Sequence, residues 1–382
     1  MAGGGRPDDA TFVLDAVRSY ALDTACPEPP PGGTWLAVAA QARVLPVILD
    51  HLALSGRPLP KGAGDWPYVG MATHLRSLVE IRAVQSAFAG TGVRWVVVKG
   101  VVLADIIYRR PSVRPYSDLD VLVHPADLGP ALDALEAAHF EVVDRNWQLI
   151  GDSSRGEISL RTPMNTTLDL HWHLLNEASI RTGFSLDVAA MVERRTTVDI
   201  DGLVVPTLRP DDTVVHLALH AALSGGHRLQ WLLDLQQALR WSDLSVAEVA
   251  VTARRAGAVL AVQTMAARAS HHVDPGLRSL VRRLGRPSPW TVAATVVSRR
   301  VPPLGTETGR RTGRLFFGAT RSTTARSVAE LVRASTAAGR RRVTNLDDSV
   351  DVSVLRTPAG DSVDRRRWVA AAAAAGASVS DT

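Results

Sequence analysis

Apolar positions at helical spacing dominate the first 90 residues of the chain. From Trp35 to Leu45 the apolar side chains recur near every third or fourth position, as on one face of a helix. Clusters of proline and glycine at 27–33 and 57–64 interrupt this pattern, and Gly90-Thr-Gly92 ends a second helical block over 71–90. We therefore predict a helical N-terminal region over residues 1–70, followed by a long helix.

Between residues 93 and 209 the pattern changes to short strands separated by turns and short helices. Strand 93–98 is apolar throughout, which is typical of a strand buried on both faces. Asp201-Gly202 is a typical two-residue hairpin turn. The predicted strands are 93–98, 118–123, 140–143, 157–161, 166–174, 196–200 and 203–207, with short helices over 101–108 and from Pro125 onward. Region 71–209 is therefore predicted to be an α/β domain.

The pattern returns to helical spacing after Asp211 and Asp212, which we expect to be helix N-caps. Three or four helices are predicted between there and about residue 285, so that residues 210–300 form a C-terminal helical domain. The remaining residues, 301–382, are rich in arginine and alanine, and we expect this tail to be partly ordered at best. The fold class predicted for the whole chain is α+β.

Composition narrows the classes of protein that fit this pattern. The 382 residues are enough for two to three domains of ~100–200 residues each, and 46% of them are hydrophobic. The single cysteine, Cys26, excludes an intramolecular disulfide and a zinc site made of cysteines. No apolar run reaches the about 18 residues needed to span a bilayer, and the first residues lack the apolar core of a signal peptide. We expect a cytoplasmic protein without a membrane partner.

The formal net charge is +5, with arginine clusters at 310–311, 340–342 and 365–367. Two interpretations fit this excess. A basic surface attracts anionic partners such as nucleotides or nucleic acid, whereas a genome rich in arginine and alanine codons produces the same composition without any such partner.

Two carboxylates mark the candidate site. Asp118 and Asp120 open the strand 118–123, and side chains two apart on a strand point to the same face. An isolated Asp-x-Asp is more often a turn cap and a solvent-exposed residue, but here a strand ending in Lys99-Gly100 and a basic loop precede it. Two adjacent carboxylates repel each other unless a cation or hydrogen bonds compensate them. A divalent metal is one such cation, so this arrangement is compatible with a site for Mg²⁺ and phosphates.

A third carboxylate is expected from another strand, and Asp169 is the candidate. In the segment 167–173, Asp169, His171 and His173 alternate with apolar residues and share one face. Three carboxylates on neighbouring strands are able to hold two Mg²⁺ ions roughly 4 Å apart. The alternative is a transition-metal site made of Asp169 and the two histidines. It is not favoured, because alternate residues on one strand lie ~6.5–7 Å apart, too far to bind one small ion easily. His171 is expected to orient Asp169 or to contact the acceptor.

These residues together resemble the uncharacterised nucleotidyltransferase family of the DNA polymerase β superfamily. The resemblance rests on Lys99-Gly100, Arg114, Asp118-Leu-Asp120 and the run Leu168-Asp-Leu-His-Trp172, and it covers roughly residues 35–245. It implies a minimal nucleotidyltransferase fold, in which helices flank a small mixed sheet. It also implies transfer of a nucleoside monophosphate from an NTP to an acceptor, with release of pyrophosphate.

The same resemblance assigns roles to the candidate residues. It implies that Asp118 and Asp120 bind both metal ions and that Asp169 shares one of them. Lys99 stands where the wider superfamily has glycine, and Gly100 where it has glycine or a serine that helps to hold the triphosphate. We expect Gly100 to let backbone N–H groups approach phosphate. For Lys99, a charge on the phosphates and a lysine that only extends to solvent are equally compatible with the sequence.

Arg114 is the preferred ligand of the triphosphate among Arg109, Arg110 and Arg114, although a solvated basic loop also fits these three residues. His216, His220, His227 and Asp234 are expected to be structural anchors rather than metal ligands.

We predict a Mg²⁺-dependent nucleotidyltransferase that acts on a hydroxyl of a small molecule, peptide or protein. The alternative is a non-catalytic nucleotide-binding or scaffold protein of a larger complex. A nucleic acid acceptor is not favoured, because the sequence contains no recognisable nucleic-acid-reading module.

Overall fold

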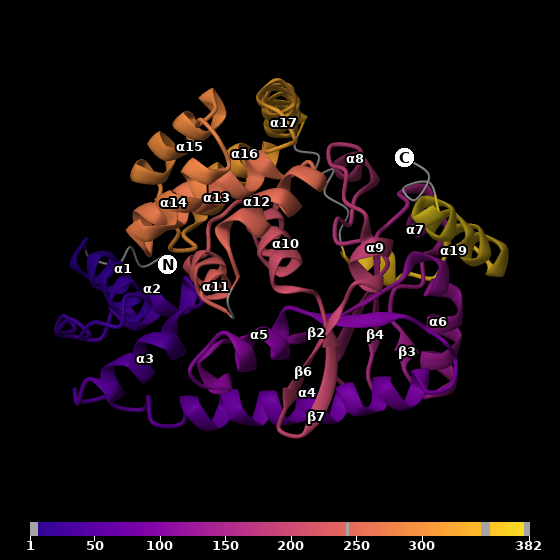
Figure 1. Ribbon diagram of the computed structural model, residues 1–382, viewed down its shortest axis with the longest axis horizontal. Coiled ribbons are helices and arrows are strands. Elements are labelled where there is room, and N and C mark those ends of the chain that lie inside the picture. Colours follow the sequence, from indigo (N-terminus) through magenta and orange to yellow (C-terminus); the bar gives the residue numbers. More distant parts are fainter. Residues whose placement is uncertain (1–6, 242–243, 345–351, 378–382) are drawn as a thin grey trace. The chain divides into compact units, whose positions relative to one another are not determined.

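A mixed seven-stranded sheet organises the central part of the chain. The computed structural model describes residues 7–241, 244–344 and 352–377 (Figure 1). The strand order is β3-β4-β5-β2-β1-β7-β6, in which β5 and β2 run parallel, as do β1 and β7, and the other neighbours are antiparallel. The strands are β1 (Trp95–Val98), β2 (Asp118–Val123), β3 (Glu141–Val142), β4 (Glu157–Arg161), β5 (Thr167–His171), β6 (Thr196–Ile200) and β7 (Leu203–Thr207).

One face of this sheet is apolar, because every second residue of its strands is aliphatic. The register aligns such residues into rows across neighbouring strands, for example Val97, Val121, Leu170 and Ile158. All four are fully buried and belong to one continuous hydrophobic core. The intervening residues, which include Asp120 and Asp169, lie on the opposite face.

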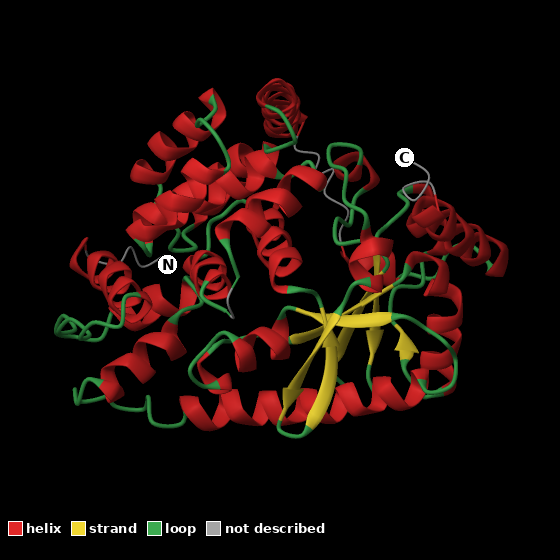
Figure 2. Cartoon of the chain, viewed as in Figure 1, coloured by secondary structure: helices red, strands yellow, loops and turns green. Residues whose placement is uncertain are grey.

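Three helices supply most of the side chains that cover the apolar face: α4 (Trp66–Phe88), α6 (Leu128–Ala137) and α19 (Ser362–Ala377) (Figures 1 and 2). From α19, Trp368 and Ala372 are buried in the core. The shorter helices of this part are α5 (Gly100–Ile106), α7 (Trp147–Asp152), α8 (Ala178–Arg181), α9 (Val188–Glu193) and α18 (Val352–Arg356), with a 3₁₀ turn at Pro125–Asp127.

The β6–β7 hairpin confirms the turn that Asp201-Gly202 predicts. Both residues have positive φ, +50° for Asp201 and +77° for Gly202. A two-residue turn with two positive φ angles matches the twist of the flanking strands, and aspartate followed by glycine tolerates those angles well.

The chain divides into two compact units. Unit 1 contains Met1–Met71, Ile107–Pro115 and Pro210–Arg340, and unit 2 contains Ala72–Ile106, Tyr116–Arg209 and Arg341–Thr382. The first and third parts of unit 1 are separate in the sequence, yet they share one unit, and helix α19 belongs to the sheet-containing unit 2 rather than to a detached tail.

In its described residues, unit 1 contains helices joined by turns and loops, and no strand. The N-terminal helices are α1 (Pro7–Ala21), α2 (Trp35–Gln41) and α3 (Leu45–Leu54), and a 3₁₀ turn spans Pro111–Val113. From Pro210 onward the helices are α10 (Pro210–Leu223), α11 (Leu229–Leu239), α12 (Val246–Arg255), α13 (Val259–His272), α14 (Arg278–Arg283), α15 (Pro289–Arg300), α16 (Glu307–Phe316) and α17 (Thr324–Thr344), with 3₁₀ turns at Pro275–Leu277 and Phe317–Ala319.

The expected N-cap role of Asp211 and Asp212 is wrong. Helix α10 already begins at Pro210, so both aspartates lie within its first turn and are buried. Proline suits the first helical position because it has no N–H to leave unbonded. Asp211 accepts a hydrogen bond of 2.6 Å from the Thr252 hydroxyl of α12.

The arginine-rich region 301–382 contains α16 to α19. The expectation of partial order in this tail also concerns residues 345–351 and 378–382, which lie outside the described residues. The side chains of the arginine cluster 340–342 likewise lie outside what the structure describes. In the part that is described, no helix is both long enough and apolar enough to cross a membrane.

A buried histidine in α13 gives unit 1 a pH-dependent stability. The Nε2 atom of His272 lies 3.0 Å from the carbonyl oxygen of Ser298. Burial lowers its pKa from 6.5 to about 3, and the nearby charges of Arg268, His271 and Arg18 act in the same direction. Between these two pKa values the unfolded chain binds the proton more readily than the folded one. The stabilising contribution of neutral His272 is therefore complete above about pH 6.5 and is lost as the pH falls toward 3.

We expect His272→Gln to flatten the acid side of the stability curve, because glutamine donates to the Ser298 carbonyl without titrating. Urea unfolding between pH 7 and pH 4 measures this effect. The exposed His139→Gln serves as the matched control, and equal pH slopes for His272→Gln and the wild type would contradict the prediction.

Candidate functional site

The turn between β1 and α5 places Lys99 and Gly100 next to the first carboxylate. Both residues have positive φ, +58° for Lys99 and +41° for Gly100. A Cβ atom on Gly100 would lie 3.3 Å from the backbone oxygen of Asp118, a close approach that only glycine makes without strain. The chain therefore passes directly beside the start of β2.

Strand pairing brings the candidate carboxylates onto one face. Strands β2 and β5 run parallel, with Asp120 paired to Asp169 and Asp118 paired to Thr167. Asp118 and Asp120 share a face because they are two residues apart, and Asp169 shares it because it is the register partner of Asp120. Val98, which precedes Lys99, is in turn the partner of Asp120 on β1.

Lys99 forms a short ion pair with Asp120. Its Nζ atom lies 2.9 Å from Oδ1 of Asp120, and the two side chains are only 16% and 7% exposed. Burial acts to lower the pKa of Lys99, but attraction to Asp120, and more weakly to Asp118 and Glu157, raises it above its usual value. Burial acts to raise the pKa of Asp120, but Lys99 and His171 outweigh it, so the pKa is well below its usual range. Both groups are charged at neutral pH.

His171 links two carboxylates instead of orienting Asp169. Its Nε2 atom lies 3.1 Å from Oδ1 of Asp120, and its Nδ1 atom lies 3.3 Å from Oε2 of Glu157. Burial acts to lower the pKa of His171, but the hydrogen bond to Asp120 and attraction to Glu157 raise it. An imidazolium ring donates from both nitrogens, so His171 is a second internal cation beside Asp120.

Sequence reasoning missed Glu157. The antiparallel β4–β5 register pairs Glu157 with His171, and Glu157 also accepts a hydrogen bond of 2.6 Å from Nδ2 of Asn176. The alternation in 157–161 carried the information, because Glu157, Ser159 and Arg161 are its polar positions. Its register against 166–174 depends on a turn that the sequence pattern does not determine.

Asp169 has a different environment from Asp120. Its Oδ1 atom accepts a hydrogen bond of 2.7 Å from the Ser159 hydroxyl, the residue opposite it on β4. Burial raises the pKa of Asp169 to about 6, against the opposing effects of His171 and Ser159. Asp169 therefore has a neutral hydrogen-bond donor where Asp120 has two cations.

The second histidine of the segment takes no part in this cluster. Nδ1 of His173 accepts a hydrogen bond of 3.0 Å from the backbone N–H of Leu175. Burial lowers the pKa of His173 to about 3, and Arg181 acts in the same direction. His173 is therefore neutral at physiological pH, with one ring nitrogen already bonded to the backbone.

Arg114 belongs to unit 1, whereas the carboxylates belong to unit 2. Its Nε and Nη2 atoms donate to the two carboxylate oxygens of Asp234, each at 2.9 Å. The Tyr108 hydroxyl donates to Oδ1 of the same carboxylate at 2.6 Å. The arginine preferred as a triphosphate ligand thus already has a buried carboxylate partner. Arg110 pairs with Asp50, and Arg109 pairs with Asp23.

The carboxylates fit a divalent cation in their chemistry and in their strand register, because carboxylate oxygens are the ligands that Mg²⁺ prefers. Asp118, Asp120 and Asp169 would hold the metal. Across the described residues, however, no three His, Cys, Asp or Glu side chains are already gathered as metal ligands. One oxygen of Asp120 is occupied by Lys99 and His171 instead.

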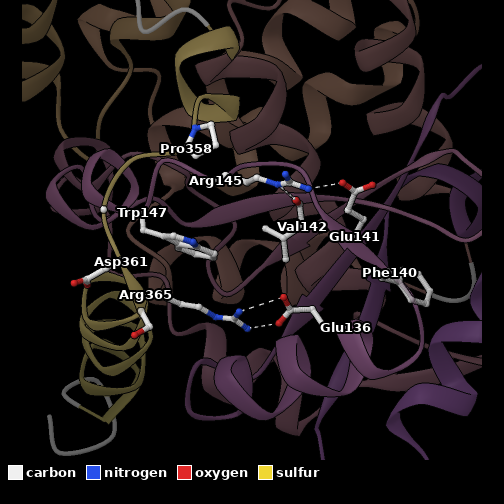
Figure 3. Close-up of a pocket in the computed structure, with 11 residues that line it drawn as sticks. Glu136, Phe140, Glu141, Val142, Arg145, Trp147, Pro358, Asp361 and Arg365 are labelled. Atoms are coloured by element: carbon white, nitrogen blue, oxygen red, sulfur yellow. Dashed lines mark hydrogen bonds and ion pairs between the residues drawn. The ribbon is translucent and has the colours of Figure 1, made fainter.

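A separate cavity of about 630 Å³ lies in unit 2, near α6, β3 and the segment that leads into α19 (Figure 3). Its two arginines are both neutralised, Arg145 by Glu141 and Arg365 by Glu136. The Arg365 guanidinium also lies over the ring of Trp147, 5.3 Å from its centroid. The cavity contains none of the residues that the sequence marks as functional.

Comparison with known proteins identifies the family of this chain. A family model described as "Uncharacterised nucleotidyltransferase" matches residues 33–274, which is more than half of the 382 residues. The chain belongs to this uncharacterised nucleotidyltransferase family. The match contains all the carboxylates of the site, together with Lys99, Gly100, Arg114 and His171, and it supports a general role in nucleotidyl transfer.

One solved structure similar to this family member is an antigenic nucleotidyltransferase-like protein from Paracoccidioides brasiliensis. The two chains are 17% identical, and the similarity covers 56% of this chain and 94% of the other, with a TM-score of 0.35. A TM-score this low has no bearing on function. No curated protein matches the chain significantly.

Proposed function

We propose that this family member transfers a nucleoside monophosphate from an NTP to a hydroxyl of a small molecule, peptide or protein, with Mg²⁺ as cofactor and pyrophosphate as the second product. The observation that carries the proposal is the β2–β5 register, which pairs Asp120 with Asp169 and places Asp118 on the same face. Membership of a nucleotidyltransferase family supports the same reaction class.

In this proposal each residue has a distinct task. Bound Mg²⁺ would supply positive charge to the phosphates and polarise the acceptor hydroxyl. Asp118 and Asp120 would hold the metal, while Asp169 would share it and accept the proton of the hydroxyl. Ser159 keeps the Asp169 carboxylate in place through its 2.7 Å hydrogen bond. Lys99 would provide a point charge for the triphosphate, and Gly100 would allow its close approach.

A second candidate, a non-catalytic nucleotide-binding or scaffold protein, is favoured by one observation. Lys99 and His171 together neutralise Asp120 without a metal. Internal cations that permanently occupied this carboxylate would leave a folded nucleotide site with no place for the metal at Asp120.

Thermal unfolding with ATP, GTP, CTP or UTP, each with and without Mg²⁺, tests the proposal. We expect one or more NTPs to raise the unfolding temperature of the wild type only when Mg²⁺ is present. The stabilisation should disappear in Asp169→Asn, because the substitution removes a metal ligand yet keeps an oxygen to accept from Ser159.

The exposed Asp65→Asn provides the matched control, since it also removes one carboxylate but lies outside the site. Stabilisation without Mg²⁺ that survives Asp169→Asn would favour the non-catalytic candidate. No stabilisation by any NTP would overturn the proposal. Release of pyrophosphate from the stabilising NTP then measures turnover with candidate hydroxyl acceptors.

A further inference from the structure

Lysine is nearly absent from this chain, yet one lysine lies in the site. Only Lys61 and Lys99 are lysines among the 43 lysine and arginine residues. Lys61 is exposed, whereas the Lys99 side chain is 16% exposed. The chain therefore uses arginine for its positive charges almost everywhere except beside Asp120.

The backbone does not explain a lysine at this position. The φ of +58° at Lys99 is in the left-handed region, where a residue with a Cβ costs about 1–2 kcal/mol relative to the usual conformation. Glycine would fit the turn with less strain. Strained residues of this kind gather at functional sites, which directs attention to the side chain of Lys99 rather than to its backbone.

The Lys99 ammonium neutralises Asp120 in the absence of a metal. It contacts Oδ1 at 2.9 Å, and Asp118 also contributes to its electrostatic environment. A lysine ammonium is a compact charge at the end of a flexible four-carbon chain, whereas a guanidinium is planar and binds carboxylates in a fixed fork. An ammonium therefore exchanges one oxygen for another by rotating a few side-chain bonds, without breaking a paired fork of hydrogen bonds.

We propose that Lys99 is an exchangeable counter-ion, which neutralises Asp120 in the free protein and moves to the nucleotide phosphates when a divalent metal binds Asp120. This inference rests on the proposed function, because it requires a metal and an NTP at the same site. Metal and Lys99 then compete for one carboxylate, and Asp120 and phosphate compete for one ammonium. By linkage, binding of the metal and binding of the NTP each favour the other.

The variant Lys99→Met distinguishes this exchange from a structural ion pair, because the exchange predicts opposite changes in the affinity for the metal and the affinity for the NTP. Mn²⁺ is the probe for the metal, measured by electron paramagnetic resonance without nucleotide. We expect its affinity to rise about tenfold, since the metal no longer displaces a charge-assisted hydrogen bond. The NTP selected by thermal unfolding is titrated in saturating Mg²⁺, and we expect its affinity to fall about tenfold, because the metal-loaded variant has no ammonium for the phosphates. Lys61→Met should change neither value.

A second measurement uses the wild type, and so does not depend on the folding of a variant. Labelling with ¹³C-lysine gives NMR signals from only two side chains. We expect Mg²⁺ with the NTP to shift the Cε signal of Lys99 and to leave that of Lys61 unchanged, with the exposed Lys61→Met providing the assignment.

The outcomes separate the inference from the function on which it rests. If metal and NTP bind to the wild type but Lys99→Met binds Mn²⁺ no more tightly, or the Lys99 signal does not move, the exchange is overturned and the proposed function stands. If neither Mn²⁺ nor any NTP binds to the wild type, both are overturned.

Discussion

Replacement of Asp120 by asparagine is expected to abolish metal-dependent NTP turnover and to lower the free energy of unfolding by about 3 kcal/mol. The loss of turnover follows from removal of a carboxylate that the proposal assigns to the metal. The loss of stability follows from the internal ion pairs, because Lys99 lies 2.9 Å and His171 3.1 Å from the same oxygen. Without the negative charge, the buried Lys99 ammonium loses its ion-pair partner, and His171 keeps only Glu157.

Urea unfolding and pyrophosphate release, applied to the single variant and to Asp120→Asn/Lys99→Met, measure the loss of stability and the loss of turnover separately. We expect the double variant to recover most of the lost stability, because the unpaired ammonium has gone, while pyrophosphate release stays at background. Turnover at the wild-type rate in either variant would contradict a role of Asp120 in the reaction. A single variant as stable as the wild type would contradict the energetic role of the ion pairs.

The elements of the sheet were predictable because local patterns determine them. Alternation in 118–123 and 157–161 and the hairpin turn at Asp201-Gly202 gave strands that the structure confirms. The short helices α7, α8 and α9 were missed, since segments of four to six residues carry too little periodicity to stand out. The assembly of unit 1 from three separate segments depends on long-range packing, which no local pattern encodes.

The candidate site also contains features that the sequence predicted and features that it did not. Period-two alternation placed Asp118 and Asp120 on one face and marked Asp169 as a third carboxylate on another strand, whereas its register opposite Asp120 came from the structure. The partner of His171 was not predictable, because Glu157 reaches it only through the β4–β5 register. Nor was the pairing of Lys99 with Asp120 anticipated, since the sequence gives the position of a lysine in the chain and not the direction of its side chain.

Arg114 illustrates how a functional expectation and a structural role can be separated by experiment. In unit 1 its guanidinium forms two parallel hydrogen bonds of 2.9 Å with Asp234, and the side chains are 7% and 1% exposed. Removing one partner of a buried ion pair leaves a charge without compensation, which costs about 3–5 kcal/mol. We therefore expect Asp234→Leu to destabilise the protein by this amount, measured by urea unfolding.

The double variant Arg114→Met/Asp234→Leu removes both charges while keeping similar side-chain volumes. Buried ion pairs are often replaced by apolar residues with little loss of stability, although the Tyr108 hydroxyl would lose the carboxylate to which it donates at 2.6 Å. We therefore expect the double variant to recover at least half of the stability that Asp234→Leu loses. The NTP affinity of this double variant decides the role of Arg114. An unchanged affinity makes the arginine purely structural, whereas a loss of tenfold or more assigns it to the triphosphate, because restored stability excludes unfolding as the cause.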